Sequence, residues 1–512
     1  MTISLNNNKR IAKNTMLLYI RMILTMIVSL YTSRVVLNTL GVNDFGTYNV
    51  VGGVVTMLTF FNGAMAAATQ RFLSYEIGLN DMVQLRKTFN AAQNIHIIIA
   101  ILVFVLAETL GIWFLKTYIN IPVNRIGAAY WMYHFSVLTF LISIIQVPYN
   151  SLLIARERFS VYAYMSIVEV IMKLGIVFML VWITFDKLIL YALLLLVVSI
   201  IIAVIYRIYS LKNFEETQFV VVKDITLYKT LINYTGWNLF GGVAAISKVQ
   251  GVSIILNLFF GTVVNAAHGV ANQVSSSVNM FVYNFQIASN PQIIKSYAKS
   301  DINYMSNLVI RTSKFSFYML LILTLPIIIE IEFVLKTWLK TVPDFTAIFT
   351  ILVLINSLVD SVSGPLMTAI QATGRIKVYQ TIVGILLILT LPISYVLFKL
   401  GFPSYATFMV SIGVSVIALV FRLLLTKKQI PEFSVNVFLK EIVFRSLPVI
   451  LLSVMLPLLI LMTMQTGFPR FIVVSFVSLF SSLIFIYFIG LNYNEKIFVK
   501  NAINAFALKI KR

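Results

Sequence analysis

The chain has 512 residues, of which 60% are hydrophobic and only 11% are charged; 39 Lys and Arg against 18 Asp and Glu give a formal net charge of +21. A soluble protein carries roughly 25% charged residues, so this composition excludes a soluble domain, and its hydrophobicity excludes a disordered chain. With no cysteine in the sequence, disulfides, thiolate metal sites and cysteine nucleophiles are excluded as well.

A helix that crosses a bilayer needs about 20 mostly apolar residues. Fourteen segments meet this condition, near 14–40, 45–75, 88–114, 126–154, 160–184, 188–210, 229–260, 262–294, 304–335, 345–372, 378–399, 404–425, 442–464 and 469–490. These runs are too long for the strands of a transmembrane barrel and lack the two-residue alternation of such strands. We therefore expect an all-α polytopic membrane protein with about 14 transmembrane helices.

The basic residues between these segments are distributed unevenly. If the amino terminus lies inside, most Lys and Arg fall in the inward-facing segments and few in the outward-facing ones. Because cytoplasmic loops are enriched in basic residues, this bias predicts that both termini are cytoplasmic. The same excess predicts contact with the anionic lipids of the inner leaflet, and without a folded soluble module we expect no nucleic acid partner.

Two halves of the sequence resemble each other. The triplet Leu115-Lys116-Thr117 recurs in the second half as Leu335-Lys336-Thr337. At a single constant offset, Pro148, Ala155, Arg158 and Tyr162 match Pro365, Ala372, Arg375 and Tyr379. We interpret this as two pseudo-symmetric six-helix lobes, 1–211 and 212–428, followed at 429–512 by an additional helix pair with a basic cytoplasmic tail. An even number of helices per repeat predicts parallel repeats around a central cavity, which rocking of the lobes would expose alternately.

The segment 37–48, with the sequence LNTLGVNDFGTY, and the segment 69–74, with TQRFLS, resemble the Wzx-type oligosaccharide and O-antigen flippases. These belong to the multidrug/oligosaccharidyl-lipid/polysaccharide exporter (MOP) superfamily. The resemblance implies a multi-pass protein of the bacterial cytoplasmic (inner) membrane. It also implies transport of an undecaprenyl-diphosphate-linked oligosaccharide from the inner to the outer leaflet, for surface polysaccharide assembly. A monomer working beside polysaccharide polymerase machinery would fit that role.

Ionisable residues inside the membrane are costly, at least about 2.5 to 3.5 kcal/mol each, and mark functional sites by default. The predicted spans contain the cations Arg21, Arg34, Arg71, Lys173 and Lys248, and the carboxylates Glu169 and Asp360. The cations outnumber the carboxylates, and an excess of positive charge suits a diphosphate.

We therefore expect Arg21, Arg34 and Lys248 to hold the diphosphate, with Arg71 as a further substrate-binding candidate. As alternatives, Arg34 would extend its charge to the outer interface and Arg71 to the inner one.

The two carboxylates suggest ion pairs inside the membrane. Glu169 and Lys173 are four residues apart and can pair on one helix face, as a structural pair or as part of a relay for a coupling H⁺ or Na⁺. Asp360 is placed to pair with Lys248. The membrane potential, a coupling H⁺ or Na⁺, and mass action from consumption of the product are three alternative driving forces for transport.

Motifs for direct catalysis are missing. The dipeptide Gly-Lys of a Walker A loop, the HExxH metal motif and the Gly-x-Ser-x-Gly elbow do not occur. We therefore predict no enzyme, no catalytic residue, no metal site and no cofactor. Two alternatives to the flippase remain: an ion-coupled drug or small-molecule antiporter of the same superfamily, and a membrane glycan polymerase or ligase.

Overall fold

The computed structural model describes residues 2–56, 60–118, 123–183, 185–339, 341–493, 495–497 and 500. Within these residues the chain is almost entirely helical and has no strand. The first half comprises α1 (Thr2–Thr56), α2 (Phe60–Leu79), α3 (Met82–Leu106), a π-helical turn (Ala107–Gly111), α4 (Ile112–Tyr118), a 3-10 turn (Val123–Arg125), α5 (Ile126–Ala155), α6 (Phe159–Trp182), α7 (Lys187–Asn213) and a second 3-10 turn (Glu215–Thr217).

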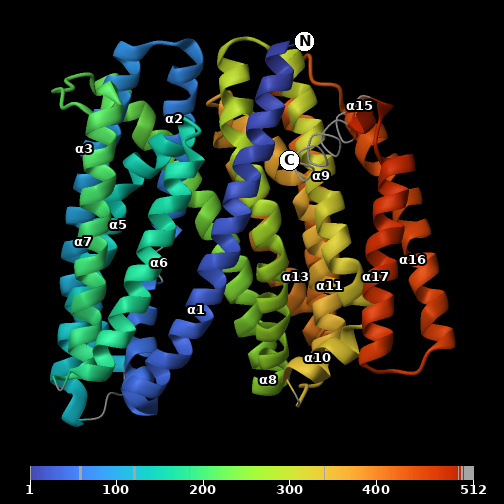
Figure 1. The fold of residues 1–512 in the computed structure, drawn as a ribbon, viewed down its shortest axis with the longest axis horizontal. Helices are drawn as coiled ribbons and strands as arrows, with labels where there is room; N and C mark the ends of the chain where they lie inside the picture. The colour runs from blue at the N-terminus through green and yellow to red at the C-terminus, as the bar shows by residue number, and fades with distance from the viewer. Residues whose placement is uncertain are drawn as a thin grey trace, which may run out of the picture. The chain divides into compact units, whose positions relative to one another are not determined.

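The second half begins with the longest helix and ends with an additional pair (Figure 1). It comprises α8 (Ile225–Ala298), α9 (Ile302–Ile329), α10 (Ile331–Leu339), α11 (Thr346–Ser361), α12 (Ser363–Ala372), α13 (Lys377–Lys399), α14 (Ala406–Gln429), α15 (Val435–Phe438), a π-helical turn (Leu439–Phe444), α16 (Arg445–Thr463), α17 (Phe468–Phe485) and a last π-helical turn (Ile486–Gly490). Eleven helical segments of the described chain are long and apolar enough to cross a membrane. The predicted all-α polytopic fold is confirmed.

Two of the helices contain a sharp kink at a glycine. At a rise of about 1.5 Å per residue, a helix of the 74 residues of α8 is far longer than a bilayer core of about 30 Å. The kink falls at Gly261, with φ 79° and ψ −172°. In α1 it falls at Gly41, the matching position of the first half, with φ 78° and ψ 167°. A positive φ combined with a ψ near 180° is accessible to glycine and costly for other residues. Equivalent glycines therefore turn the chain in both halves.

The left-handed residues at helix ends also recur at matching positions of the two halves. Asn80 and Ser300 both have a φ of 59°, and Glu157 and Gly374 have φ values of 58° and 78°. The same hydrogen bonds surround the first pair: the N–H groups of Asn80 and Ser300 donate to the carbonyls three residues earlier, at 3.3 and 2.9 Å. The two halves therefore share their backbone conformation at these positions, although the residue types there differ.

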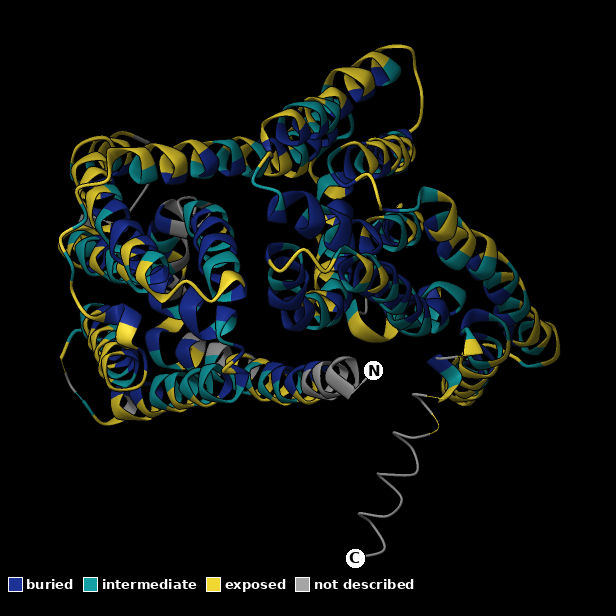
Figure 2. Cartoon of the chain, turned by 90° about the horizontal axis from the view of Figure 1, so that it is seen from above, coloured by how far each residue is buried: buried dark blue, intermediate teal, exposed yellow. Residues whose placement is uncertain are grey.

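The chain forms two compact units. One comprises Met1–Val243, Ile287–Asp301 and Gln371–Thr381, and the other Ala244–Gln286, Ile302–Ile370 and Ile382–Arg512. Because the ends of α8 and α12 pack with the N-terminal helices, these units do not follow the predicted lobe boundaries at 211 and 428. The predicted lobes stay a prediction. Figure 2 marks exposed residues along the helices, and many of them are large and apolar, as expected where helices face lipid.

In the second unit, ion pairs attach the additional helix pair to α9 and its neighbourhood. The fully buried Lys314 ammonium donates to Glu495 Oε2 at 2.6 Å and to Glu441 Oε2 at 2.9 Å. Arg470, near the start of α17, forms a forked pair with the buried Glu330 carboxylate at 2.7 and 2.9 Å. Buried charges without a partner are strongly unfavourable, so these pairs fix how α16 and α17 dock.

Candidate functional site

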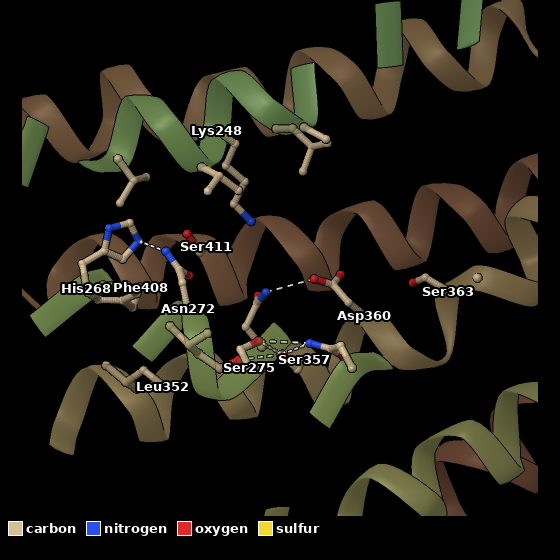
Figure 3. Close-up of a pocket in the computed structure, with 18 of the residues that line it drawn as sticks. Lys248, His268, Asn272, Ser275, Leu352, Ser357, Asp360, Ser363, Phe408 and Ser411 are labelled. Carbon is tan, nitrogen blue, oxygen red and sulfur yellow. Dashed lines mark hydrogen bonds between the residues drawn. The ribbon is translucent and has the colours of Figure 1, made fainter. Parts of the chain in front are cut away.

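A polar cavity of about 450 Å³ lies within the second compact unit (Figure 3). Its walls come from α8, α11, α14 and the start of α12, with one residue from α13. The cavity is lined by Ala245, Lys248, Val249, Val252, His268, Asn272, Ser275, Asn279, Leu352, Val353, Asn356, Ser357, Asp360, Ser363, Gly364, Met367, Leu387, Phe408, Ser411 and Arg422. A cavity with so many polar groups inside apolar helices is the strongest candidate for a binding site.

One wall is a polar stripe along α8. His268, Asn272, Ser275 and Asn279 follow one another at steps of four, three and four residues, which places them on one face of a helix. Asn272 Nδ2 lies 2.8 Å from His268 Nε2, and Asn279 Nδ2 donates to Ser275 Oγ at 3.0 Å. The hydroxyl and amide groups of this stripe therefore line the cavity.

The adjoining wall is a broken helix, which contacts the stripe through Ser357, whose Oγ lies 2.9 Å from Ser275 Oγ. The tenth predicted span, 345–372, divides into α11 and α12 at Val362. Pro365 has no N–H to donate to the carbonyl of Ser361, and Gln286 Nε2 donates to that oxygen at 2.9 Å instead. Ser313 Oγ donates to the carbonyl of Val362 at 2.9 Å. Side chains of neighbouring helices thus donate to the carbonyl groups that the break leaves without a helical partner. Irregular backbone inside a membrane requires such hydrogen bonds.

Three charged residues line this cavity. Figure 3 shows Lys248 extending from α8 into the space opposite Asp360. The Asp360 carboxylate accepts from Asn356 Nδ2 at 2.9 Å and from Ser415 Oγ at 3.3 Å. Arg422, on α14, donates to Ser363 Oγ at 3.1 Å. Two cations and one carboxylate give the walls an excess of positive charge.

The predicted direct pair between Lys248 and Asp360 is not formed. Both side chains line the same cavity, but no hydrogen bond or ion pair of 4.0 Å or less joins them among the described residues. The Asp360 carboxylate is held instead by the amide of Asn356 and the hydroxyl of Ser415, both within reach on neighbouring turns and helices. An anionic group entering the cavity could therefore approach Lys248 without first breaking an ion pair.

The other predicted substrate-binding residues lie in the first compact unit. Arg21 Nη1 donates to Ser166 Oγ at 3.5 Å, and its guanidinium stacks over the Tyr162 ring at 4.7 Å from the centroid. Arg21 is thus held against α6. Arg34 lies on α1, but its side chain is outside the described part of the structure, so its expected role stays a prediction.

Arg71 contacts backbone. Its Nε donates to the carbonyl of Gln371 at 3.1 Å, and its Nη2 to the carbonyl of Ala372 at 2.8 Å. The last carbonyls of a helix have no partner within it, and a cation placed there also stabilises the helix dipole. Arg71 therefore caps the end of α12, and its ring neighbours Phe72 and Tyr75 cover the guanidinium.

Glu169 and Lys173 form an ion pair on α6, with Lys173 Nζ 2.6 Å from Glu169 Oε1. The side chains of Lys173 and Glu169 are 42% and 37% exposed, so solvent or cargo can reach the pair. This contact lies in the first unit and does not belong to the cavity of α8, α11 and α14.

Sequence reasoning missed several residues of the cavity. Arg422 falls near the end of the predicted span 404–425 and was not among the expected cations inside the membrane. Asn272 was recognisable as a polar residue inside a span, and the helical period that it shares with His268, Ser275 and Asn279 could have marked the whole polar face. The contribution of Asn356 and Ser357 depends on where α11 packs, which sequence spacing does not determine.

Solved structures with a similar fold are membrane transporters. An outward-facing multidrug resistance MATE family transporter of the MOP superfamily aligns with a TM-score of 0.72 over 84% of this chain and 97% of its own, at 10% identity. The MATE transporter ClbM in complex with Rb⁺ aligns with a TM-score of 0.70, over 84% and 96% of the two chains, at 12% identity. A MOP superfamily transporter from Pyrococcus furiosus, described by the reverse polarity of its binding pocket, gives a TM-score of 0.69 over 83% and 96%, at 11% identity.

No protein-family model and no curated protein sequence matches the chain. At 10 to 12% identity the likeness concerns the fold and carries no residue roles. The chain is therefore a multi-pass membrane protein with the fold of the MATE transporters of the MOP superfamily.

Proposed function

We propose that this protein is a transporter that flips an undecaprenyl-diphosphate-linked oligosaccharide from the inner to the outer leaflet of the bacterial cytoplasmic membrane by alternating access. The observation that carries the proposal is the cavity of the second unit, in which Lys248 and Arg422 outnumber the single carboxylate of Asp360. The fold shared with transporters supports transport as the activity.

The positive excess fits the charged part of such a cargo. A diphosphate loses its hydration when it crosses the membrane. Cationic side chains that line its path can compensate for that loss. Arg422 offers a forked donor set to phosphate oxygens, and Lys248 offers a mobile point charge. Lys248 forms no ion pair of 4.0 Å or less with a carboxylate of the described residues.

The neutral polar lining fits the sugar part. Asn272, Asn279 and Asn356 carry both donors and acceptors, and so do the serine hydroxyls beside them. Sugar hydroxyls need such mixed partners, because each donates and accepts. The apolar walls around Val249 and Leu352 would pack against the faces of the sugar rings.

Reconstitution with a labelled lipid-linked glycan tests this proposal. The wild-type protein in vesicles should expose the labelled glycan to an external enzyme, and Lys248→Gln should reduce the rate at least about tenfold at unchanged protein level. Lys399→Gln, at the end of α13 and outside the cavity, is the matched control and should keep full rate. Full activity of the Lys248 variant would contradict the proposal, as would absence of flipping by the wild-type protein.

An ion-coupled drug antiporter is the second candidate. The exposed Asp360 carboxylate could receive a cationic drug, and one structure of similar fold is a multidrug resistance transporter. Under this alternative Asp360→Asn would abolish efflux of cationic dyes from cells, whereas Lys248→Gln would spare it. The two variants therefore separate an anionic cargo from a cationic one.

The remaining parts of the proposal rest on the distribution of basic residues, on the missing motifs and on the resemblance to Wzx-type flippases. We expect cytoplasmic termini, a monomer that works beside polysaccharide polymerase machinery, and no cofactor. Coupling to H⁺ or Na⁺ would be tested in the same vesicles, since flipping that persists after every ion gradient is collapsed excludes obligate coupling.

A further inference from the structure

A second cavity, of about 640 Å³, lies in the first compact unit between α3, α5 and α7. Most of its wall is apolar. It is lined by Phe89, Asn90, Gln93, Asn94, Ile97, Ile142, Ile145, Gln146, Tyr149, Ile200, Ala203, Val204, Arg207, Leu211, Thr217 and Phe219. We call this cavity the α3–α7 groove. It shares no residue with the polar cavity of the second unit.

The groove is open along its side. Ile97 is 40% exposed, Ile200 is 45% exposed and Val204 is 48% exposed. All three lie on helices long and apolar enough to cross the membrane. An apolar side chain exposed at that depth faces acyl chains, so the natural occupant of the groove is the chain of an amphiphile.

One end of the groove is charged. Arg207 lies in the last two turns of α7, which ends at Asn213 close to the end predicted to be cytoplasmic. Among the described residues its guanidinium makes no hydrogen bond or ion pair, whereas neighbouring basic residues are engaged: Arg156 pairs with Glu216 at 2.7 Å, and Arg86 donates to the carbonyl of Gln218 at 3.2 Å. The described walls of the groove contain no Asp or Glu.

We propose that the α3–α7 groove binds an anionic glycerophospholipid of the inner leaflet, with an acyl chain along Ile97, Ile200 and Val204 and the headgroup phosphate at Arg207. A guanidinium matches phosphate oxygens with a planar fork of donors. Gln146 adds an amide donor at the groove wall, where the glycerol ester oxygens would lie, and Gln93 adds the second N–H of an amide that already donates to the carbonyl of Ile145 at 3.3 Å. The combination of an apolar channel and a cation at the interface selects an anionic lipid over a zwitterionic one, whose own ammonium would lie close to the arginine.

The bound lipid would also contact the connection between the two repeats. The segment after α7 closes one end of the groove through Thr217 and Phe219. Asn90, another groove residue, holds this segment by donating to the carbonyl of Gln218 at 3.1 Å and accepting from the N–H of Val220 at 3.3 Å. The lipid would therefore lie beside the segment that leads to α8.

Native mass spectrometry of the purified full-length protein tests the proposal and needs no transport. The protein is titrated with phosphatidylglycerol and phosphatidylcholine of identical chains. We expect the wild type to favour phosphatidylglycerol by about fivefold, the factor that one interfacial arginine supplies, and Arg207→Gln to lose that preference. Lys212→Gln, an exposed basic residue on the same helix outside the groove, is the matched control and should keep it.

Ala203→Trp fills the groove and should reduce retention of both lipids, with Ala203→Leu as the milder variant if the tryptophan impairs folding. An unchanged preference in Arg207→Gln would overturn the proposal, as would unchanged lipid retention in a folded Ala203 variant. A polyprenyl phosphate that displaces phosphatidylglycerol from the wild type would overturn the assignment to a phospholipid and point to the cargo lipid instead.

Discussion

Gly78 packs directly against Ala298, the residue at the equivalent position of the second half. A Cβ atom at Gly78 would lie 2.7 Å from the Cβ of Ala298 and 3.0 Å from the Cα and carbonyl oxygen of Lys295. All of these residues belong to the first compact unit. The ends of α2 and α8 can approach this closely only because one of the two equivalent residues has no side chain.

Substitution of Gly78 by Ala should therefore destabilise the protein by about 1–3 kcal/mol, because neither Ala298 nor the backbone of Lys295 can move aside without shifting a helix. Gly63→Ala is the control on the same helix, where nothing lies within 4 Å of the added Cβ. It should be neutral or slightly stabilising, since alanine favours a helix over glycine by about 0.5–1 kcal/mol. Thermal unfolding of the two variants in detergent measures the difference, and equal midpoints would disprove the close contact.

The carboxylate of Glu157 anchors the end of α5 to the end of α8. Its side chain is fully buried, and its Oε1 accepts from Lys295 Nζ at 2.6 Å and from Gln292 Nε2 at 2.8 Å. Glu157→Gln would leave the ammonium of Lys295 with a neutral neighbour in place of its counter-ion. Breaking a buried ion pair from one side costs about 3–5 kcal/mol, so this variant should lose stability on that scale.

The double variant Glu157→Gln with Lys295→Met should recover most of that loss, because no buried charge is then left without its partner. Glu215→Gln, which changes an exposed carboxylate of the same unit, serves as the control and should leave the unfolding midpoint unchanged. A double variant no more stable than Glu157→Gln alone would show that the ion pair is not what the single change disrupts.

The repeat could be predicted from the sequence, whereas the contacts between helices could not. Composition, hydrophobic length and the constant offset between matching residues predicted helices, spans and repeat, because each depends on local pattern. The offset aligns Asn80 with Ser300 and Glu157 with Gly374, but it could not reveal that each pair shares a left-handed φ, because the residue types differ. Contacts such as Gly78 with Ala298 depend on how the helices pack, which no periodicity encodes.

The candidate site was predicted in part, for a similar reason. Searching for charges inside the membrane found Lys248 and Asp360, which do line one cavity. The same search interpreted Arg71 as a substrate-binding residue or as one that extends to the inner interface, and it could not anticipate that Arg71 donates to backbone carbonyls at the end of α12. The carbonyl groups at a helix end carry no charged side chain, so a search for ionisable residues does not find them.

Arg71→Lys tests this structural interpretation. Lysine keeps the charge but replaces the fork that contacts two carbonyls with a single ammonium, so we expect a loss of about 1.5–3 kcal/mol of stability. If Arg71 instead acts only on the cargo, the variant should unfold at the wild-type temperature while transport falls. Measuring thermal unfolding beside flipping in vesicles separates the two roles. Arg86→Lys is the control, because its contacts to the carbonyls of Gln218 and Phe219 are exposed.

Asp186 should make part of the stability dependent on acid pH. It lies in the loop before α7, where Arg125 Nη1 donates to its Oδ2 at 2.6 Å and the N–H of Leu188 donates to its Oδ1 at 3.1 Å. Partial burial alone would raise the pKa of Asp186, but the hydrogen bond from Arg125, with the capped backbone N–H groups, outweighs burial and lowers it. A carboxyl whose pKa is lower in the folded state stabilises folding above its ordinary pKa of about 3.9.

That contribution is lost as the pH falls through the lowered pKa of the folded state. The unfolding midpoint of the wild type should therefore drop between about pH 5 and pH 2, and Asp186→Asn should flatten this part of the profile. Asp81→Asn removes a helix-capping carboxylate that accepts from the N–H of Gln84 at 2.9 Å and has no ion pair among the described residues. Asparagine caps a helix about as well as aspartate, so this variant should keep both the midpoint at neutral pH and the acid slope. If Asp186→Asn keeps the full acid slope, Arg125 is not what stabilises the charged carboxylate.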